Sequence, residues 1–232
     1  MTREDLARFA ALPIDFGAIG LLEPGVPQEP YFCDPVDGEP VGRLGCDGVH
    51  FILLPGDERV FCVDPAMGEP GRYVLPVAED FRQFLSFVLF CGDANPISQI
   101  WWTEEEQFRD FLKEESERSW EGMEDVLEQK RAALAAVAAA FSLEGADPYE
   151  KVKALQASYD PAYLQFSEEY YDVLGLERQI RRNMIPEDPV ILLGFVNTKL
   201  RDEYPSLDEL CASLGENRAK LERQADRHWI QL

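Results

Sequence analysis

The sequence predicts an α+β fold, with an antiparallel or mixed sheet and packed helices in the N-terminal half and an all-helical C-terminal half. Three observations lead to this prediction. Short β-branched and aromatic runs lie between residues 49 and 77, an apolar helical pattern follows over 81–91, and helical spacing continues from 103 onward. With 232 residues and 46% apolar side chains, the chain can bury a sizeable core.

Three strands and a short edge strand are expected in the N-terminal half. The apolar runs Val49–Leu54 and Arg59–Asp64 flank a four-residue turn that starts with Pro-Gly, which predicts a β-hairpin. Arg72–Val77 is expected to form the third strand, which Pro76 would end. A short edge strand is also expected at Tyr31–Cys33, within a region rich in Pro and Gly.

The helix expected over 81–91 follows these strands. Its apolar side chains recur at helical spacing and also fill the flanks, so we expect it to be buried on most of its circumference and to pack on the sheet. Gly92 stands where a C-terminal cap is expected. Thr103 and Glu106 have the spacing of a capping box, which predicts that the next helix begins there.

The C-terminal half carries several helix-start signals. Asp-Pro pairs at 147–148, 160–161 and 188–189 each predict a helix, Ser206 and Glu209 form a further capping box, and Gly215 separates the last helix. We therefore expect a sheet-plus-helix domain over 1–115, a helical extension over 116–185 and a small three-helix domain over 186–232.

Charge is the dominant feature of the composition. The formal net charge is −22, and residues 1–100 carry sixteen carboxylates against six arginines, with the first lysine at Lys113. Such a surface repels nucleic acid and anionic membranes, and it attracts a basic partner at low salt. Solubility is the other explanation of this charge, because a net charge far from zero keeps proteins from associating.

The cysteines and the absence of apolar spans indicate a cytoplasmic protein. The five cysteines Cys33, Cys46, Cys62, Cys91 and Cys211 are irregularly spaced without a CxxC pair, and are expected to be reduced core residues. No apolar run reaches the roughly 18 residues of a membrane span. The chain start lacks the pattern of a secretion signal.

No catalytic, metal or cofactor motif is found, so no enzyme activity and no cofactor are expected. The sequence contains no GxSxG, P-loop, HExxH or GxGxxG after a strand. His50, inside a strand, is expected to be a hydrogen-bonded core or edge histidine rather than a base or ligand. The residues considered for partner binding are Trp102 as an exposed aromatic anchor, with Glu104, Glu105 and Asp64. Glu104 and Glu105 have the alternative role of favouring the dipole of a helix N-terminus.

Residues 1–115 resemble the SUKH superfamily, which includes immunity proteins that neutralise bacterial toxins and a domain of fungal cell-wall synthesis regulators. The resemblance is carried by Val77 followed by Phe81, Phe84 and Leu85, and by the segments 91–94, 99–102 and 106–108. It implies a sheet-plus-helix domain that binds another protein. Separately, Ile185–Gly215 is similar to a short uncharacterised bacterial family of small helical domains, which implies no activity.

These observations lead to one main hypothesis and two alternatives. The main hypothesis is a non-enzymatic protein-binding module, an immunity protein that neutralises a basic toxin or nuclease domain. The first alternative is a hydrolase that uses paired carboxylates in a cleft between sheet and helices. The second is a regulator whose last helices form a helix-turn-helix, although residues 201–232 hold seven acidic residues against five basic ones.

Overall fold

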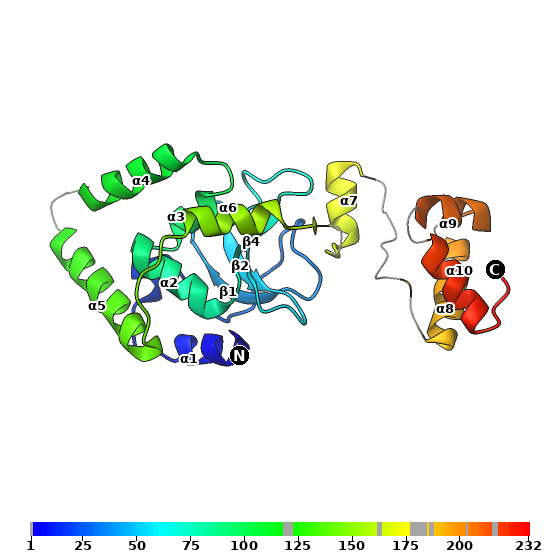
Figure 1. Ribbon diagram of the computed structural model, residues 1–232, viewed down its shortest axis with the longest axis horizontal. Coiled ribbons are helices and arrows are strands. Elements are labelled where there is room, and N and C mark those ends of the chain that lie inside the picture. Colours follow the sequence, from blue (N-terminus) through cyan, green and yellow to red (C-terminus); the bar gives the residue numbers. More distant parts are fainter. Residues whose placement is uncertain are drawn as a thin grey trace. The chain divides into compact units, whose positions relative to one another are not determined.

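The computed structural model describes residues 2–117, 123–161, 164–176, 185, 188–202, 204–214 and 218–232. Contacts divide the chain into two compact units. The sheet unit comprises residues 1–161 and 165–170, and the helical unit comprises residues 162–164 and 171–232. In Figure 1 helix α1 (Thr2–Ala10) and the 3-10 turn η1 (Phe16–Ile19) come first, then the strands, then the remaining helices, and the α+β prediction is confirmed.

The sheet consists of four antiparallel strands that are neighbours in chain order. They are β1 Glu39–Arg43, β2 His50–Leu53, β3 Val60–Val63 and β4 Val74–Ala78. The predicted hairpin is confirmed, since β2 and β3 pair with His50 opposite Val63 and Leu53 opposite Val60. Every residue of β2 and β3 is buried, which requires cover on both faces of the sheet.

The edge strand β1 was not predicted. It contains Pro40 and Gly42, which weaken a strand pattern, and its register with β2 shifts between these two residues. The prediction of an edge strand at Tyr31–Cys33 is wrong. These residues form a turn, which the backbone N–H of Asp34 closes by donating to the carbonyl of Tyr31 at 2.9 Å.

The opposite edge strand, β4, contains Pro76 in its interior rather than at its end. Pro76 lies opposite Phe61, one residue beyond a shift in the register of β3 and β4. An edge strand tolerates proline because the missing N–H can face away from the ladder. The side chain of Gln156 donates to the Pro76 carbonyl at 3.3 Å, so helix α6 (Tyr149–Ala157) is tied to this strand.

Helix α2 (Phe81–Cys91) packs on one face of the sheet, as predicted (Figure 1). It begins after Asp80, whose carboxylate accepts a 2.8 Å backbone hydrogen bond from the first turn, and ends at Gly92, which has a φ of 73°. The rings of Phe84 and Phe51 lie 4.8 Å apart between helix and sheet. The prediction that α2 is buried on most of its circumference is confirmed only in part, because the side chain of Phe90 is 41% exposed.

Two helices follow, α3 (Asn95–Gln99) and α4 (Glu105–Glu117). The predicted capping box is displaced by one residue. The Thr103 hydroxyl donates to the Gln99 carbonyl at 2.9 Å, and the Gln107 side chain accepts from the backbone N–H of Glu104 at 3.0 Å. The reciprocal contact of a capping box is therefore made by Gln107 to Glu104 rather than by Glu106 to Thr103.

The middle helices α5 (Met123–Phe141) and α6 share the core of the sheet, so the expected boundary after residue 115 does not separate two units. Val137, Phe141 and Val152 are fully buried in the same apolar cluster as Phe84. These side chains cover α2 and β4, which would otherwise expose apolar surface. Residues 118–122, 162–163 and 177–184 of the expected extension lie outside the described residues.

Aromatic side chains meet beside the other face of the sheet. Phe61 of β3 contacts Tyr159 with ring centroids 5.8 Å apart. Phe166 and Tyr170 stack at 4.0 Å, and Tyr170 also contacts Phe32 and Tyr73. A helix was also expected to begin at Asp160-Pro161, but residues 162–163, on which this prediction falls, lie outside the described residues; α7 follows from Glu168 to Leu174.

The helical unit contains α8 (Pro189–Asp202), α9 (Leu207–Leu214) and α10 (Arg218–Arg227). Two predicted starts are confirmed. The Asp188 carboxylate accepts backbone hydrogen bonds of 2.9 and 3.1 Å from the first turn of α8, and the Ser206 hydroxyl accepts one of 3.2 Å from Glu209. Gly215 lies outside the described residues. The buried core side chains are Ile185, Leu192, Val196, Leu210, Cys211, Leu214 and Leu221.

Candidate functional site

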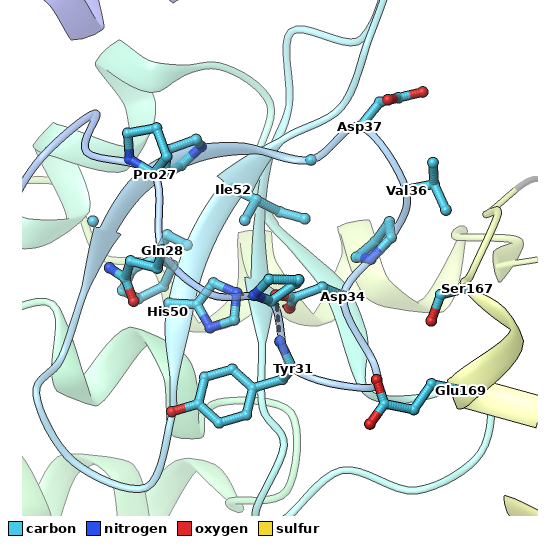
Figure 2. Close-up of a pocket in the computed structure, with 16 residues that line it drawn as sticks. Pro27, Gln28, Tyr31, Asp34, Val36, Asp37, His50, Ile52, Ser167 and Glu169 are labelled. Carbon is cyan, nitrogen blue, oxygen red and sulfur yellow. Dashed lines mark hydrogen bonds and ion pairs between the residues drawn. The ribbon is translucent and has the colours of Figure 1, made fainter. Parts of the chain in front are cut away.

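A cavity of about 410 Å³ lies in the sheet unit, where the segment 27–38 passes over strands β1 and β2 (Figure 2). Ser167 and Glu169, at the start of α7, close another side of it. The segment is held there by a 2.8 Å hydrogen bond from the backbone N–H of Val36 to the carbonyl of Gln165. The lining residues are Pro27, Gln28, Pro30, Tyr31, Asp34, Pro35, Val36, Asp37, Gly38, Pro40, Gly42, His50, Phe51, Ile52, Ser167 and Glu169.

Strand alternation explains which side chains of β2 reach the cavity. Phe51 and Leu53 enter the core beneath α2, so His50 and Ile52 project to the opposite face. Figure 2 shows Tyr31, Asp34 and His50 close together, with the Ile52 side chain beside them.

His50 and Asp34 form a buried ion pair at this site. The Nε2 atom of His50 lies 2.9 Å from Asp34 Oδ1, and its Nδ1 atom lies 2.7 Å from the carbonyl oxygen of Gly48. Both neighbours are acceptors, so both ring nitrogens need to carry a proton. The geometry therefore fits an imidazolium. The other carboxylate oxygen of Asp34 accepts a 2.9 Å hydrogen bond from the backbone N–H of Tyr31.

The surroundings raise the pKa of His50 above its usual value of 6.5. Burial acts in the opposite direction, because removing the imidazolium from water disfavours the charged form. The hydrogen-bonding and charge interactions with Asp34, together with the Gly48 carbonyl, outweigh that cost. The turn that lies over His50 therefore favours the charged form of its imidazole.

The ring of Tyr31 stacks on the imidazole of His50. The ring centroids are 5.8 Å apart with an interplanar angle of 26°, and Tyr31 remains 43% exposed. Gly48 permits this arrangement. Its φ is +71°, and a Cβ atom placed there would lie 2.6 Å from Tyr31 Cζ, which is closer than side chains tolerate.

The cavity has an acidic rim. Among the described residues that line it, Asp34, Asp37 and Glu169 are carboxylates, and His50 is the only basic residue. Because His50 and Asp34 compensate each other, Asp37 and Glu169 leave the lining with a net negative charge. Figure 2 places the two at different parts of the rim, with the Asp37 carboxylate turned outward.

The residues considered for partner binding from the sequence do not line this cavity. Trp102 is 45% exposed, and Glu104 and Glu105 are exposed at the start of α4. Glu105 pairs with Arg109 at 3.0 Å on the same helix. These three residues form an exposed group of their own, whereas Trp101 is half-buried, and its buried indole N–H has no hydrogen-bond partner among the described residues.

Asp64 is buried and stabilises the loop that follows β3. It is 5% exposed, and its carboxylate accepts a 2.9 Å hydrogen bond from the backbone N–H of Met67, in the loop after β3. Its backbone pairs with Tyr73 and accepts from Gly68. Little of Asp64 is available to another molecule, and the sequence offered no signal that separates it from exposed aspartates.

The cavity residues were not identified from the sequence, although His50 was expected to be a hydrogen-bonded core or edge histidine and is one. Tyr31 and Asp34 lie in a Pro- and Gly-rich segment without periodicity, and Ser167 and Glu169 come from a distant part of the chain. No local pattern joins these residues, so only the tertiary contacts could reveal the cavity.

The described residues give little support for a metal site, a reactive thiol or a membrane-spanning helix. No group of three or more His, Cys, Asp or Glu side chains in the described part of the chain could hold a metal ion. Burial raises the pKa of Cys33 and of Cys91 to about 12 and that of Cys62 well above its usual range, which keeps these thiols protonated. No helix in the described ranges is long and apolar enough to cross a bilayer.

Comparison with known protein families identifies a match in the C-terminal part of the chain. Residues 186–228, a range that contains α8, α9 and α10, match the family described as "Domain of unknown function (DUF4250)". No curated protein and no solved structure matches the chain. The C-terminal resemblance seen in the sequence is therefore supported by a defined family, whose description carries no activity.

Proposed function

We propose that the sheet unit binds a basic protein partner and catalyses no reaction. The resemblance of residues 1–115 to the SUKH superfamily suggests the class of partner, a bacterial toxin domain such as a nuclease. The protein would then act as an immunity protein in the cytoplasm, where free thiols such as those of its five cysteines stay reduced.

The charge of the chain is the observation that carries this proposal. A net charge of −22, with sixteen carboxylates and six arginines in the first 100 residues, produces a strongly negative potential around the sheet unit. Complementary charge accelerates the encounter with a basic partner and disfavours acidic competitors. A nuclease domain carries basic surface because it has to bind phosphates, so its surface would be complementary to this one.

Two exposed features could contact such a partner. The first is the acidic rim of the cavity, and the second is the exposed group of Trp102, Glu104 and Glu105. Tryptophan is enriched among the residues that dominate binding energy, because it buries a large surface at low entropic cost. Trp102 therefore makes a specific test of the second feature.

The geometry of the cavity weighs against a catalytic role for His50. Both of its ring nitrogens are occupied, so His50 has no free nitrogen with which to accept a proton from a substrate. Asp34, its partner, is likewise engaged by Tyr31. These contacts support a binding role rather than general acid–base chemistry.

Isothermal titration calorimetry of the full chain against a basic toxin domain, taken from a gene that adjoins its own, tests the proposal. We expect binding that weakens steeply with salt, together with loss of the toxin's activity in the complex. Absence of binding at low salt, or binding without any effect on toxin activity, would contradict the proposal.

A matched pair of variants tests the Trp102 group. We expect Trp102→Ala to weaken binding by about 2 kcal/mol if Trp102 anchors the partner. Phe90→Ala serves as the control, because Phe90 has a similar exposure of 41% against 45% but lies on α2. Equal effects of the two substitutions on binding would show that Trp102 is not part of the interface.

A further inference from the structure

We infer that the cavity beneath the segment 27–38 binds an arginine side chain of the basic partner. This inference rests on the proposed function, and it adds the chemistry of the contact and the residues that make it.

The lining favours a cation over an anion. Both ring nitrogens of His50 already face acceptors, at 2.7 and 2.9 Å, so His50 has no N–H left to donate to an anionic ligand. The described lining residues include no lysine or arginine, whereas Glu169 and Asp37 contribute uncompensated negative charge. The negative lining therefore stabilises a positively charged group that enters the cavity, and it repels a phosphate or a carboxylate.

The walls suit a long side chain with a planar charged end. Prolines and the side chains of Val36 and Ile52 line much of the cavity, which gives the methylene groups of arginine an apolar surface. Tyr31, at 43% exposure, offers a ring face on which a guanidinium can stack. The volume of about 410 Å³ leaves room for such a side chain together with water.

Arginine matches these features better than lysine. The guanidinium is planar, stacks on aromatic rings and is less strongly hydrated than an ammonium group, so it enters a half-apolar cavity at lower cost. The Glu169 carboxylate provides an acceptor that matches the fork of donors on the guanidinium, and Figure 2 shows its side chain directed toward the part of the loop that carries Tyr31.

NMR titration of the full chain with N-acetyl-arginine amide tests this inference directly. We expect saturable shifts of the Ile52 and Val36 methyl signals and of the Tyr31 ring signals. The citrulline analogue has nearly the same shape without the charge and should produce no saturable shift. The lysine analogue should bind about three-fold or more weakly. Equal shifts with arginine and citrulline probes, or no saturable shift with the arginine probe, would overturn the inference.

Three variants locate the contact. Glu169→Gln removes one carboxylate of the rim, and we expect it to raise the Kd for the arginine probe about three-fold. Tyr31→Leu retains apolar volume but removes the ring face, and should also raise the Kd about three-fold. Glu29→Gln makes the same change as Glu169→Gln at an exposed residue of the same segment that does not line the cavity, and should leave the Kd unchanged.

The experiments distinguish a failure of the cavity inference from a failure of the proposed function. If the chain binds its basic partner with salt dependence while the arginine probe leaves the Ile52, Val36 and Tyr31 signals unchanged, the cavity inference is wrong and the proposed function stands. If the probe binds in the cavity but no basic protein partner binds the chain, the cavity inference stands and the proposed function is wrong. An effect of Glu29→Gln equal to that of Glu169→Gln would show a non-specific charge effect and overturn the assignment to the cavity.

Discussion

The hydroxyl of Tyr149 donates a 3.0 Å hydrogen bond to the backbone carbonyl of Thr103. Forty-six residues separate the two, and the ring of Tyr149 also contacts Phe108 with centroids 5.4 Å apart. The contact fastens the start of α6 to the junction between α3 and α4. The middle helices are therefore part of the sheet unit, and residues 1–115 lack part of their own core.

Truncation tests this dependence. A fragment of residues 1–115 loses the buried side chains of α5 and α6, including Val137, Phe141 and Val152, and we expect it to bind a hydrophobic dye and unfold without cooperativity. A fragment of residues 1–170 keeps these contacts and should unfold cooperatively in urea. Cooperative unfolding of the 1–115 fragment would contradict the shared core.

Tyr149→Phe gives a finer measure of the same contact. The substitution removes only the hydroxyl and leaves the buried Thr103 carbonyl without this donor, so we expect a loss of about 1 kcal/mol in the free energy of unfolding. Chemical denaturation of the full chain measures it. An unchanged midpoint and slope would mean that the hydrogen bond contributes nothing.

Helix α2 provides a pair of phenylalanines with different burial. Phe84 is fully buried against Phe51, and its replacement by alanine should cost about 3–5 kcal/mol, because a cavity remains in the core. Phe90 is 41% exposed, and Phe90→Ala should change the free energy of unfolding by less than about 1 kcal/mol. Similar costs for both would show that α2 is buried on most of its circumference, as the sequence led us to expect.

Gly48→Ala tests the packing of Tyr31 over the β1–β2 turn. Both Gly48 and Gly56 have positive φ angles, +71° and +73°, so alanine at either position should cost about 1–2 kcal/mol of backbone strain. At Gly48 the new methyl group also meets the Tyr31 ring, whereas at Gly56 nothing lies within 4 Å. We therefore expect Gly48→Ala to be the more destabilising, and Tyr31→Ala in the same chain to remove the difference.

The ion pair of His50 and Asp34 makes stability depend on pH. The pKa of His50 is raised in the folded state, so the contribution of the pair is fully present below the unfolded-state value of about 6.5. It is lost as the pH rises through the raised pKa, because the folded protein then gives up its additional proton. Denaturation over this range should show a fall in stability, and Asp34→Asn should flatten it. A wild-type stability that rises over the same interval would refute the assignment.

Local pattern was enough to predict the centre of the sheet unit. The β-branched and aromatic runs Val49–Leu54 and Arg59–Asp64, joined by a four-residue turn, identified the hairpin, and the 3.6-residue spacing over 81–91 identified α2. The start of α8 at Asp188 followed from the chemistry of a single cap. These features depend on neighbours within a few residues, which the sequence displays directly.

The sequence by itself determined the α+β class, the central hairpin, α2 and the negative charge of the chain. The tertiary structure alone decided that α5 and α6 join the sheet, that Glu39–Arg43 is a strand, and that Tyr31, Asp34, His50 and Glu169 surround one cavity. The reason is physical. Pairing at an edge and the meeting of distant loops depend on contacts such as that from Val36 to Gln165, and these contacts leave no periodicity in the chain.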